Sequence, residues 1–158
     1  MTMQASEMAE VAERYTECLY RMCFMMLGQH ADAEDAVADT LVRCMTKAPL
    51  FQDEAHRKAW LFRVAANICR DMLRFRFRRP VLQLEELADC GIPPEDVPIL
   101  EAVFRLPEKY RIVLHLFYIE GYRTEEIAGM LSISPAAVRK RLQYAREKLK
   151  VEYERNDE

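Results

Sequence analysis

The stretch TEEIAGMLSISPAAVRKRLQYAREKLK, residues 124–150, decides how the C-terminal part of the chain folds. Two amphipathic segments flank the short sequence Ser132-Ile133-Ser134. Thr124 can cap the first segment, and Ser134 followed by Pro135 supplies a hydroxyl cap and a preset φ for the second. At helical spacing, the inward positions are Ile127, Ala128, Leu131, Val138, Leu142, Ala145 and Leu149. The stretch therefore predicts two helices, about 125–131 and 135–150, that form a helix-turn-helix.

The second predicted helix is strongly basic. Between residues 135 and 150 it carries six cations and a single acid, Glu147. Arg139, Gln143 and Arg146 are spaced by four and three residues, so they share its outer face. Arginine and glutamine can read base edges in the major groove, and further cations such as Lys140 suit phosphates. A helical hairpin with an ordinary solvated basic face is the plainer alternative. The turn length, the cap and the charge together favour DNA binding.

Composition predicts an all-α chain of two small helical domains joined by a proline-rich acidic linker. The sequence holds only 4 glycines in 158 residues. Residues 80–98, PVLQLEELADCGIPPEDVP, contain four prolines and five acids but no basic side chain, which is typical of a linker. We therefore predict an N-terminal helical domain over 1–79, a linker over 80–98 and a C-terminal helix-turn-helix domain over 99–158.

Apolar spacing predicts three helices in the first domain. Gly28 is a plausible stop for the first, Asp32 a cap for the second, and Asp53 a cap for the third, which should run to about residue 78. The core stripe of the third helix is Leu61, Val64, Ala65, Ile68 and Met72. In the second domain we expect a short helix around 99–105. A further helix should begin at Pro107 and stop near Gly121.

A second face of the third helix mixes aromatic, amide and cationic side chains. Its members, at steps of three and four, are Trp60, Arg63, Asn67, Arg70 and Arg74. Such a surface can hold unstacked bases and their backbone, and Phe51 just before the helix could add to a base pocket. The equally weighted alternative is that Trp60 fills the core and the arginines are merely solvated. The second helix presents Asp35, Ala38, Asp39 and Val42, which alone indicate only a solvated acidic face.

No motif in the sequence indicates catalysis, so we expect neither an enzyme nor a cofactor. A glycine-rich phosphate loop, a metal-ligand cluster and a nucleophile elbow are all missing from the sequence. The five cysteines lack CxxC spacing, which favours buried, reduced thiols; a redox switch or a zinc site is the alternative. Without an 18-residue apolar run or a secretory signal, we expect a cytoplasmic protein with no membrane insertion.

Three segments together resemble the extracytoplasmic-function (ECF, group IV) sigma factors of bacterial RNA polymerase. Residues 27–43, LGQHADAEDAVADTLVR, look like the polymerase-binding helix of that family, with its hallmark DAEDAV at 32–37. Residues 59–74 look like the helix that recognises the minus-10 element. Residues 106–149 look like the domain that reads the minus-35 element. The resemblance covers about residues 10–150.

The resemblance implies a sigma factor that binds core RNA polymerase and directs promoter recognition and DNA opening. The residues implied to dock on the clamp helices of the largest polymerase subunit are Asp35, Ala38, Asp39, Leu41, Val42 and Met45. Those implied for the minus-10 strand are Phe51, Trp60, Arg63, Asn67, Arg70 and Arg74. Those implied for the minus-35 duplex are Arg139, Lys140, Gln143 and Arg146. An anti-sigma factor is a further partner implied by the family alone.

Some positions depart from the usual family pattern. Leu41 and Met45 stand where large aromatics are more common, and Ser132 stands where glycine is common. The pair Ala136-Ala137 replaces a frequent Gly-Thr, which removes a possible phosphate or base contact. Two other classes of function stay open at this point. A stand-alone helix-turn-helix regulator would bind a palindromic operator without polymerase, and a helical interaction protein would show no salt-sensitive DNA affinity.

Overall fold

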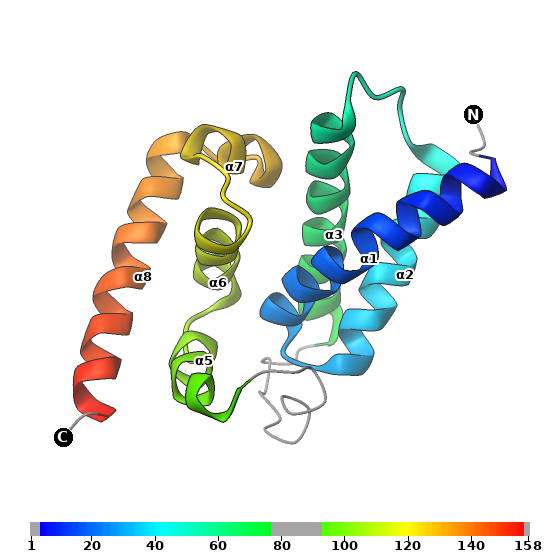
Figure 1. Cartoon of the computed structure of the whole chain (residues 1–158). Helices are drawn as coiled ribbons and strands as arrows, with labels where there is room; N and C mark the ends of the chain where they lie inside the picture. The colour runs from blue at the N-terminus through cyan, green and yellow to red at the C-terminus, as the bar shows by residue number, and fades with distance from the viewer. Residues whose placement is uncertain (1–3, 77–92, 157–158) are drawn as a thin grey trace. The chain divides into compact units, whose positions relative to one another are not determined.

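The computed structural model describes residues 4–76 and 93–156, and all regular structure within these ranges is helical. The chain divides into two compact units, residues 1–79 and 80–158 (Figure 1). The helices of the first unit are α1 (Ala5–Leu27), α2 (His30–Lys47) and α3 (Glu54–Arg76). Those of the second are η1 (Pro94–Asp96), α5 (Val97–Phe104), α6 (Glu108–Leu114), η2 (His115–Ile119), α7 (Thr124–Leu131) and α8 (Pro135–Asn156). The predicted fold class, all-α with a helix-turn-helix in the second unit, is confirmed.

The first unit is a bundle in which each of the three helices packs against the other two. Its core consists of side chains that recur every three or four residues, as in α1, where Val11, Tyr15, Leu19 and Met22 are buried. The predicted stop of α1 is confirmed. Gly28 adopts φ 73° and donates its N–H to the carbonyl oxygen of Phe24 at 2.8 Å, a left-handed ending that suits glycine.

One of the two predicted helix caps in the first unit is correct. Asp53 accepts a hydrogen bond from the backbone N–H of His56 at 2.7 Å and so satisfies a free donor at the start of α3. The prediction that Asp32 caps the second helix is wrong. The Ala33 N–H already bonds the carbonyl oxygen of Gln29, so α2 begins at His30 and leaves Asp32 buried in its first turn.

In the second unit, α7 and α8 form the predicted helix-turn-helix. The Ser134 hydroxyl accepts the Ala137 N–H at 3.1 Å, which confirms that cap. Thr124 is not the cap of α7, because it is already the first helical residue. There, the Glu126 carboxylate accepts the backbone N–H of Arg123 at 3.0 Å. The predicted inward residues of the two helices are buried, apart from a half-buried Leu149.

The helix expected from Pro107 to Gly121 is instead two elements. α6 covers Glu108–Leu114, and η2 continues it as a π-helical turn. Within α6 lies Arg111, a cation that is only 1% exposed. It donates to the carbonyl oxygen of Leu106 and lies 5.0 Å over the Phe104 ring, and desolvation lowers its pKa to about 10. Helical structure begins at Pro94, where η1 starts, within the segment predicted as the linker; residues 80–92 lie outside the described part of the chain.

Candidate nucleic-acid and protein interfaces

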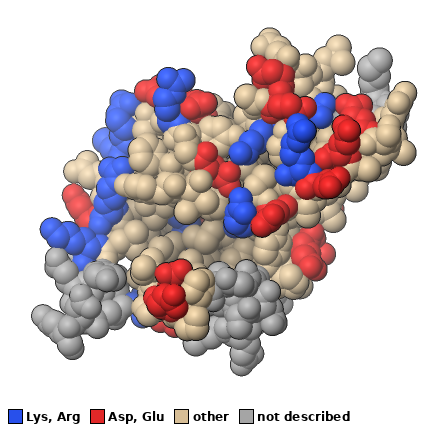
Figure 2. Space-filling model, in the orientation of Figure 1, with Lys and Arg blue, Asp and Glu red and all other residues tan. Residues whose placement is uncertain are grey.

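The outer face of α8 is a line of exposed cations. Arg139, Lys140 and Gln143 are all exposed, as their spacing predicted. Lys and Arg side chains follow α8 along one edge in Figure 2, whereas acidic and basic groups are interspersed over α1 and α2. Gln143 forms a long hydrogen bond of 3.4 Å to Glu147 on the same helix. This face can meet a polyanion without first breaking strong internal bonds.

Arg146 is the exception on this face, because it is held by the preceding π-helical turn. Its Nε donates to the hydroxyl oxygen of Tyr118 at 2.5 Å. Its guanidinium also lies 5.6 Å from the ring centre of Phe117 and 5.5 Å from that of Tyr118. Sequence reasoning missed both aromatic residues. Residues 118 and 146 are 28 positions apart, so only the packing of η2 on α8 brings them together.

An aromatic pair stands where the loop after α2 enters α3. Trp60 is half-buried, and its ring centre lies 5.7 Å from that of Phe51 in an edge-to-face arrangement. The core of α3 is filled by other side chains, including the fully buried Leu61 and Phe62. The guanidinium of Arg57 lies 5.3 Å from the ring centre of Phe51. Trp60 is therefore neither a core residue nor an isolated surface one, and it retains an accessible part beside a second ring.

Cations and an amide extend this aromatic pair along α3. Arg63, Asn67 and Arg74 are exposed, and Arg70 is half-buried. The Asn67 side-chain oxygen accepts a hydrogen bond from Arg70 at 2.7 Å, and Arg74 lies 3.9 Å from Asp71. All of the residues predicted for this face lie on one side of α3 or at its start. Together they offer ring faces, an amide and positive charge to an unpaired strand.

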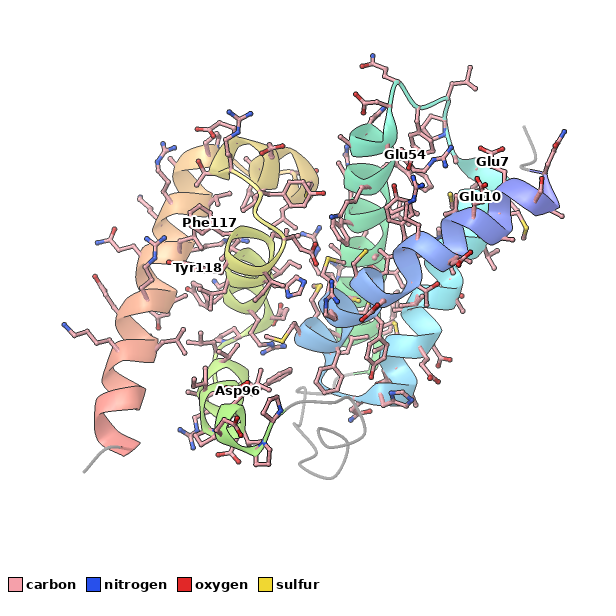
Figure 3. The ribbon with its side chains drawn as sticks, in the orientation of Figure 1. Glu7, Glu10, Glu54, Asp96, Phe117 and Tyr118 are labelled. Atoms are coloured by element: carbon pink, nitrogen blue, oxygen red, sulfur yellow. The ribbon has the colours of Figure 1, made fainter. Side chains whose placement is uncertain are left out.

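The start of α3 is fixed to α1 by a network of charged groups. Arg57, whose side chain is 18% exposed, bonds Glu7 at 3.0 Å and Glu54 at 3.3 Å, and Arg14 also bonds Glu54 at 3.3 Å. The Tyr15 hydroxyl donates to the Glu54 carboxylate, and this bond lowers the pKa of that carboxyl group. Figure 3 shows Glu7 and Glu54 beside each other at this end of α1 and α3. The network fixes the helix that carries the aromatic pair.

Two of the six predicted protein-docking residues of α2, Ala38 and Leu41, line a groove. Asp35, Ala38, Asp39 and Val42 are exposed, while Leu41 and Met45 are half-buried. A groove of about 620 Å³ runs between α1 and α2. The residues that line it are Ala12, Glu13, Thr16, Glu17 and Tyr20 of α1, and His30, Glu34, Val37, Ala38 and Leu41 of α2. Sequence reasoning missed the α1 wall, because the spacing within one helix does not reveal which neighbour lies beside it.

The described cysteines lie mainly in the core. Cys23, Cys44 and Cys69 are buried and Cys18 is partly so, while Cys90 lies outside the described residues. A hydrogen bond with Cys23, together with burial, raises the pKa of the Cys69 thiol, which disfavours its reactive thiolate form.

Within residues 4–76 and 93–156, no group of three or more His, Cys, Asp or Glu side chains could hold a metal ion. None of the described helices is long and apolar enough to cross a bilayer.

Two family descriptions match this chain, one in each unit. Sigma-70 region 2 matches residues 11–79, and Sigma-70, region 4 matches residues 96–149. The first range holds the α2 groove and the α3 face. The second holds η2 and the helix-turn-helix.

Related sequences and structures agree with these matches. The ECF RNA polymerase sigma factor SigL of Mycobacterium tuberculosis is 31% identical, over 90% of this chain and 86% of its own length. The ECF RNA polymerase sigma factor SigW of Bacillus subtilis is 28% identical with the same coverage. Among solved structures, CnrH in complex with the cytosolic domain of CnrY superposes with a TM-score of 0.71 at 26% identity, covering 94% of this chain and 88% of CnrH. The sigma factor RpoE of Bartonella quintana, in complex with the anti-sigma factor NepR, shares the fold with a TM-score of 0.75 at 20% identity, covering 95% and 98%.

The likeness to SigL extends over nearly all of both chains, and the matched regions contain all three candidate interfaces, on α2, α3 and α8. The chain belongs to the ECF RNA polymerase sigma factors, and it directs promoter recognition in transcription initiation.

Proposed function

We propose that this chain is a group IV sigma factor of the cytoplasm that contacts core RNA polymerase and promoter DNA through three separate faces. Residues 1–79 bind core polymerase and the minus-10 element, residues 99–158 bind the minus-35 element, and residues 80–98 connect them. The observation that carries the proposal is the edge-to-face pair of Phe51 and Trp60, 5.7 Å apart, at the head of a cationic helix face. Such a surface suits unpaired bases, which a duplex-binding regulator does not need to capture.

The α2 face is the proposed contact with the clamp helices of the largest polymerase subunit. Exposed carboxylates of Asp35 and Asp39 flank an apolar surface that includes Ala38 and Val42. Leu41 and Ala38 also line the groove against α1, so a helix of the partner can bury apolar side chains there. The groove extends the proposed contact to α1 residues such as Thr16.

The α3 face is the proposed site of strand opening. A base leaving the duplex stacks against the exposed part of Trp60 or Phe51, while Arg63, Asn67 and Arg74 hold the strand. Removing a base from the stack costs a few kcal/mol, and these contacts offset that cost. The α8 face carries the proposed contact with the minus-35 duplex through Arg139, Lys140 and Gln143, with Arg146 beside them. RNA synthesis itself belongs to the polymerase.

An anti-sigma factor is a further proposed partner. CnrH, which is 26% identical to this chain, was solved in complex with the cytosolic domain of CnrY. The shared fold over 94% of this chain supports a comparable protein partner here, and a bound partner would limit access to polymerase.

The test is a pull-down and run-off transcription assay with bacterial core RNA polymerase and genomic promoter fragments. We expect the chain to bind core and give discrete start sites, and the double variant Asp35→Arg/Asp39→Arg to lose both. The matched control is Glu10→Arg/Asp71→Arg, which makes the same change in charge at exposed positions outside the groove and should bind core normally. Specific DNA binding by a chain that never binds core would instead identify a stand-alone regulator.

A further inference from the structure

The turn between α6 and α7 presents two aromatic side chains to the recognition helix. In η2 the Glu120 N–H bonds the carbonyl oxygen of His115 at 3.1 Å, a five-residue step that inserts one extra residue relative to an α-helix. The insertion rotates the side chains that follow it about the helix axis. Figure 3 shows Phe117 and Tyr118 on this segment beside α8. Phe117 is half-buried, whereas Tyr118 is 55% exposed and so remains accessible to a ligand.

The ends of this turn are anchored in the core of the second unit. The side chains of His115 and Glu120 are 2% and 5% exposed, and His115 Nε2 lies 3.4 Å from Glu120 Oε1. The neighbouring Leu116 is also buried. With both ends held by buried groups, the turn can act as a rigid support rather than as a mobile loop.

The bond to Tyr118 holds the Arg146 guanidinium in an orientation that suits binding of an oxyanion. The Tyr118 hydroxyl engages Nε, and the Phe117 and Tyr118 rings lie against the guanidinium. The two terminal amino groups of that guanidinium form the fork that binds phosphate oxygens. Because one donor and the ring contacts already fix the side chain, less conformational entropy is lost when a phosphate binds.

The position of Arg146 along α8 favours a phosphate over a base edge. Residue 146 comes eleven positions after Pro135, the first residue of α8, which is about 16 Å along the helix axis. The major groove is about 12 Å wide, and a recognition helix inserts its N-terminal residues into it. Arg139 therefore lies within reach of base edges, and Arg146 lies at the wall of the groove.

We propose that Tyr118 is a positioning residue that holds Arg146 as a preformed clamp for a DNA backbone phosphate of the minus-35 duplex. The pair raises affinity for every promoter sequence and reads no base. This inference rests on the proposed function, because it requires α8 to meet that duplex. It assigns a role in DNA binding to η2, a segment outside the helix-turn-helix itself.

The test uses the full chain assembled with bacterial core RNA polymerase. A promoter fragment selected by the wild-type holoenzyme is compared with fragments that carry single substitutions in the minus-35 segment, each over a range of KCl concentrations. Arg146→Ala should weaken binding roughly 10-fold, and the factor should be the same on every fragment. It should also reduce the slope of log affinity against log salt by about 1. Tyr118→Phe should weaken binding by roughly 3-fold, again uniformly, with the salt slope nearly unchanged because the charge remains.

A double variant tests whether Tyr118 acts through Arg146. In the Arg146→Ala background, Tyr118→Phe should have no further effect on affinity. The matched control is Tyr144→Phe, another exposed tyrosine of this unit, whose ring stacks on Tyr110. It should bind as wild type does, and all variants should melt at the wild-type temperature.

Three results would overturn the proposal: a loss confined to one base pair, an effect of Tyr118→Phe that persists without Arg146, or unchanged binding by either single variant. Wild-type holoenzyme that ignores substitutions in the minus-35 segment would instead contradict the proposed function, and the clamp with it. The two failures are therefore distinguishable within one set of measurements.

Discussion

The α3 face and the α8 face are both basic, but they are built differently. The start of α3 is fixed by ion pairs to α1, and the guanidinium of Arg57 lies beside the Phe51 ring of the aromatic pair. On α8, Arg139 and Lys140 extend into solvent, and Arg146 is held by aromatic side chains instead of by acids. The difference matches the two tasks that we propose for these faces. Capture of an unpaired base needs ring surfaces fixed in place, whereas contact with a duplex phosphate needs charge that is not already neutralised.

The largest expected effect separates the two faces by the kind of DNA that each is proposed to bind. Trp60→Ala should weaken binding of a minus-10 single-stranded oligonucleotide by holoenzyme by roughly 10- to 100-fold, because one stacking surface is lost. Arg139→Ala should leave that binding unchanged. Fluorescence anisotropy of a labelled oligonucleotide measures both, and Trp60→Phe should retain most of the affinity. If Trp60→Ala bound the single strand as wild type does, Trp60 would contribute only to packing. The proposed difference between the α3 and α8 faces would then be wrong.

The ion-pair network should contribute measurably to stability. Arg57→Met removes two ion pairs and the contact with Phe51 and leaves two carboxylates without that cation, so we expect a loss of about 2 kcal/mol in the free energy of unfolding. The chain contains a single tryptophan, so fluorescence of Trp60 during denaturant unfolding reports on the first unit. The control Arg14→Met removes one ion pair of a largely exposed side chain and should therefore cost much less stability than Arg57→Met. Equal losses of unfolding free energy in the two variants would show that the ion pairs of Arg57 do not stabilise the first unit.

The smallest expected effect is a dependence of stability on pH. The bond from Tyr15 lowers the pKa of Glu54 in the folded chain below its ordinary value of 4.5. The ionised carboxylate therefore stabilises the fold above pH 4.5, and this contribution is lost as the pH falls through the folded pKa. Because Glu54 is half exposed, the effect should be below about 1 kcal/mol. As the pH is lowered from 5 to 3, the free energy of unfolding should fall less for Glu54→Gln than for wild type. In a Tyr15→Phe background, this difference between chains with and without Glu54→Gln should become smaller. Parallel curves of stability against pH for wild type and Glu54→Gln would refute this.

Local signals in the sequence predicted the helices and the outward faces well. Gly28, Asp53 and Ser134 act through bonds that reach at most four residues along the chain, so their roles were readable from spacing. The exposed faces of α2, α3 and α8 followed from helical periodicity for the same reason. Asp32 was misjudged because a backbone bond to Gln29 already begins α2. Thr124 was misjudged because Glu126 accepts the N–H of Arg123, so α7 begins one residue earlier than a Thr124 cap would place it.

Contacts between distant residues were not readable from the sequence. The bond from Arg146 to Tyr118 and the α1 wall of the groove both depend on which helices become neighbours. The burial of Arg111 is a further example, because a single cation among apolar residues resembles an ordinary exposed position until its carbonyl partner is located. In each case the decisive partner lies outside the periodic pattern of the helix concerned, or on another element.

The left-handed backbone of the turn before α8 has a consequence for how this chain can evolve. Ser132 adopts φ 58°, a conformation that costs an L-residue about 1 kcal/mol and that glycine adopts freely. The replacement Ser132→Gly should therefore stabilise the second unit without altering the face of α8 that we propose to contact DNA. Most single substitutions destabilise the domain in which they lie. The stability gained by replacing Ser132 with glycine could offset such losses and allow substitutions that change the promoters recognised.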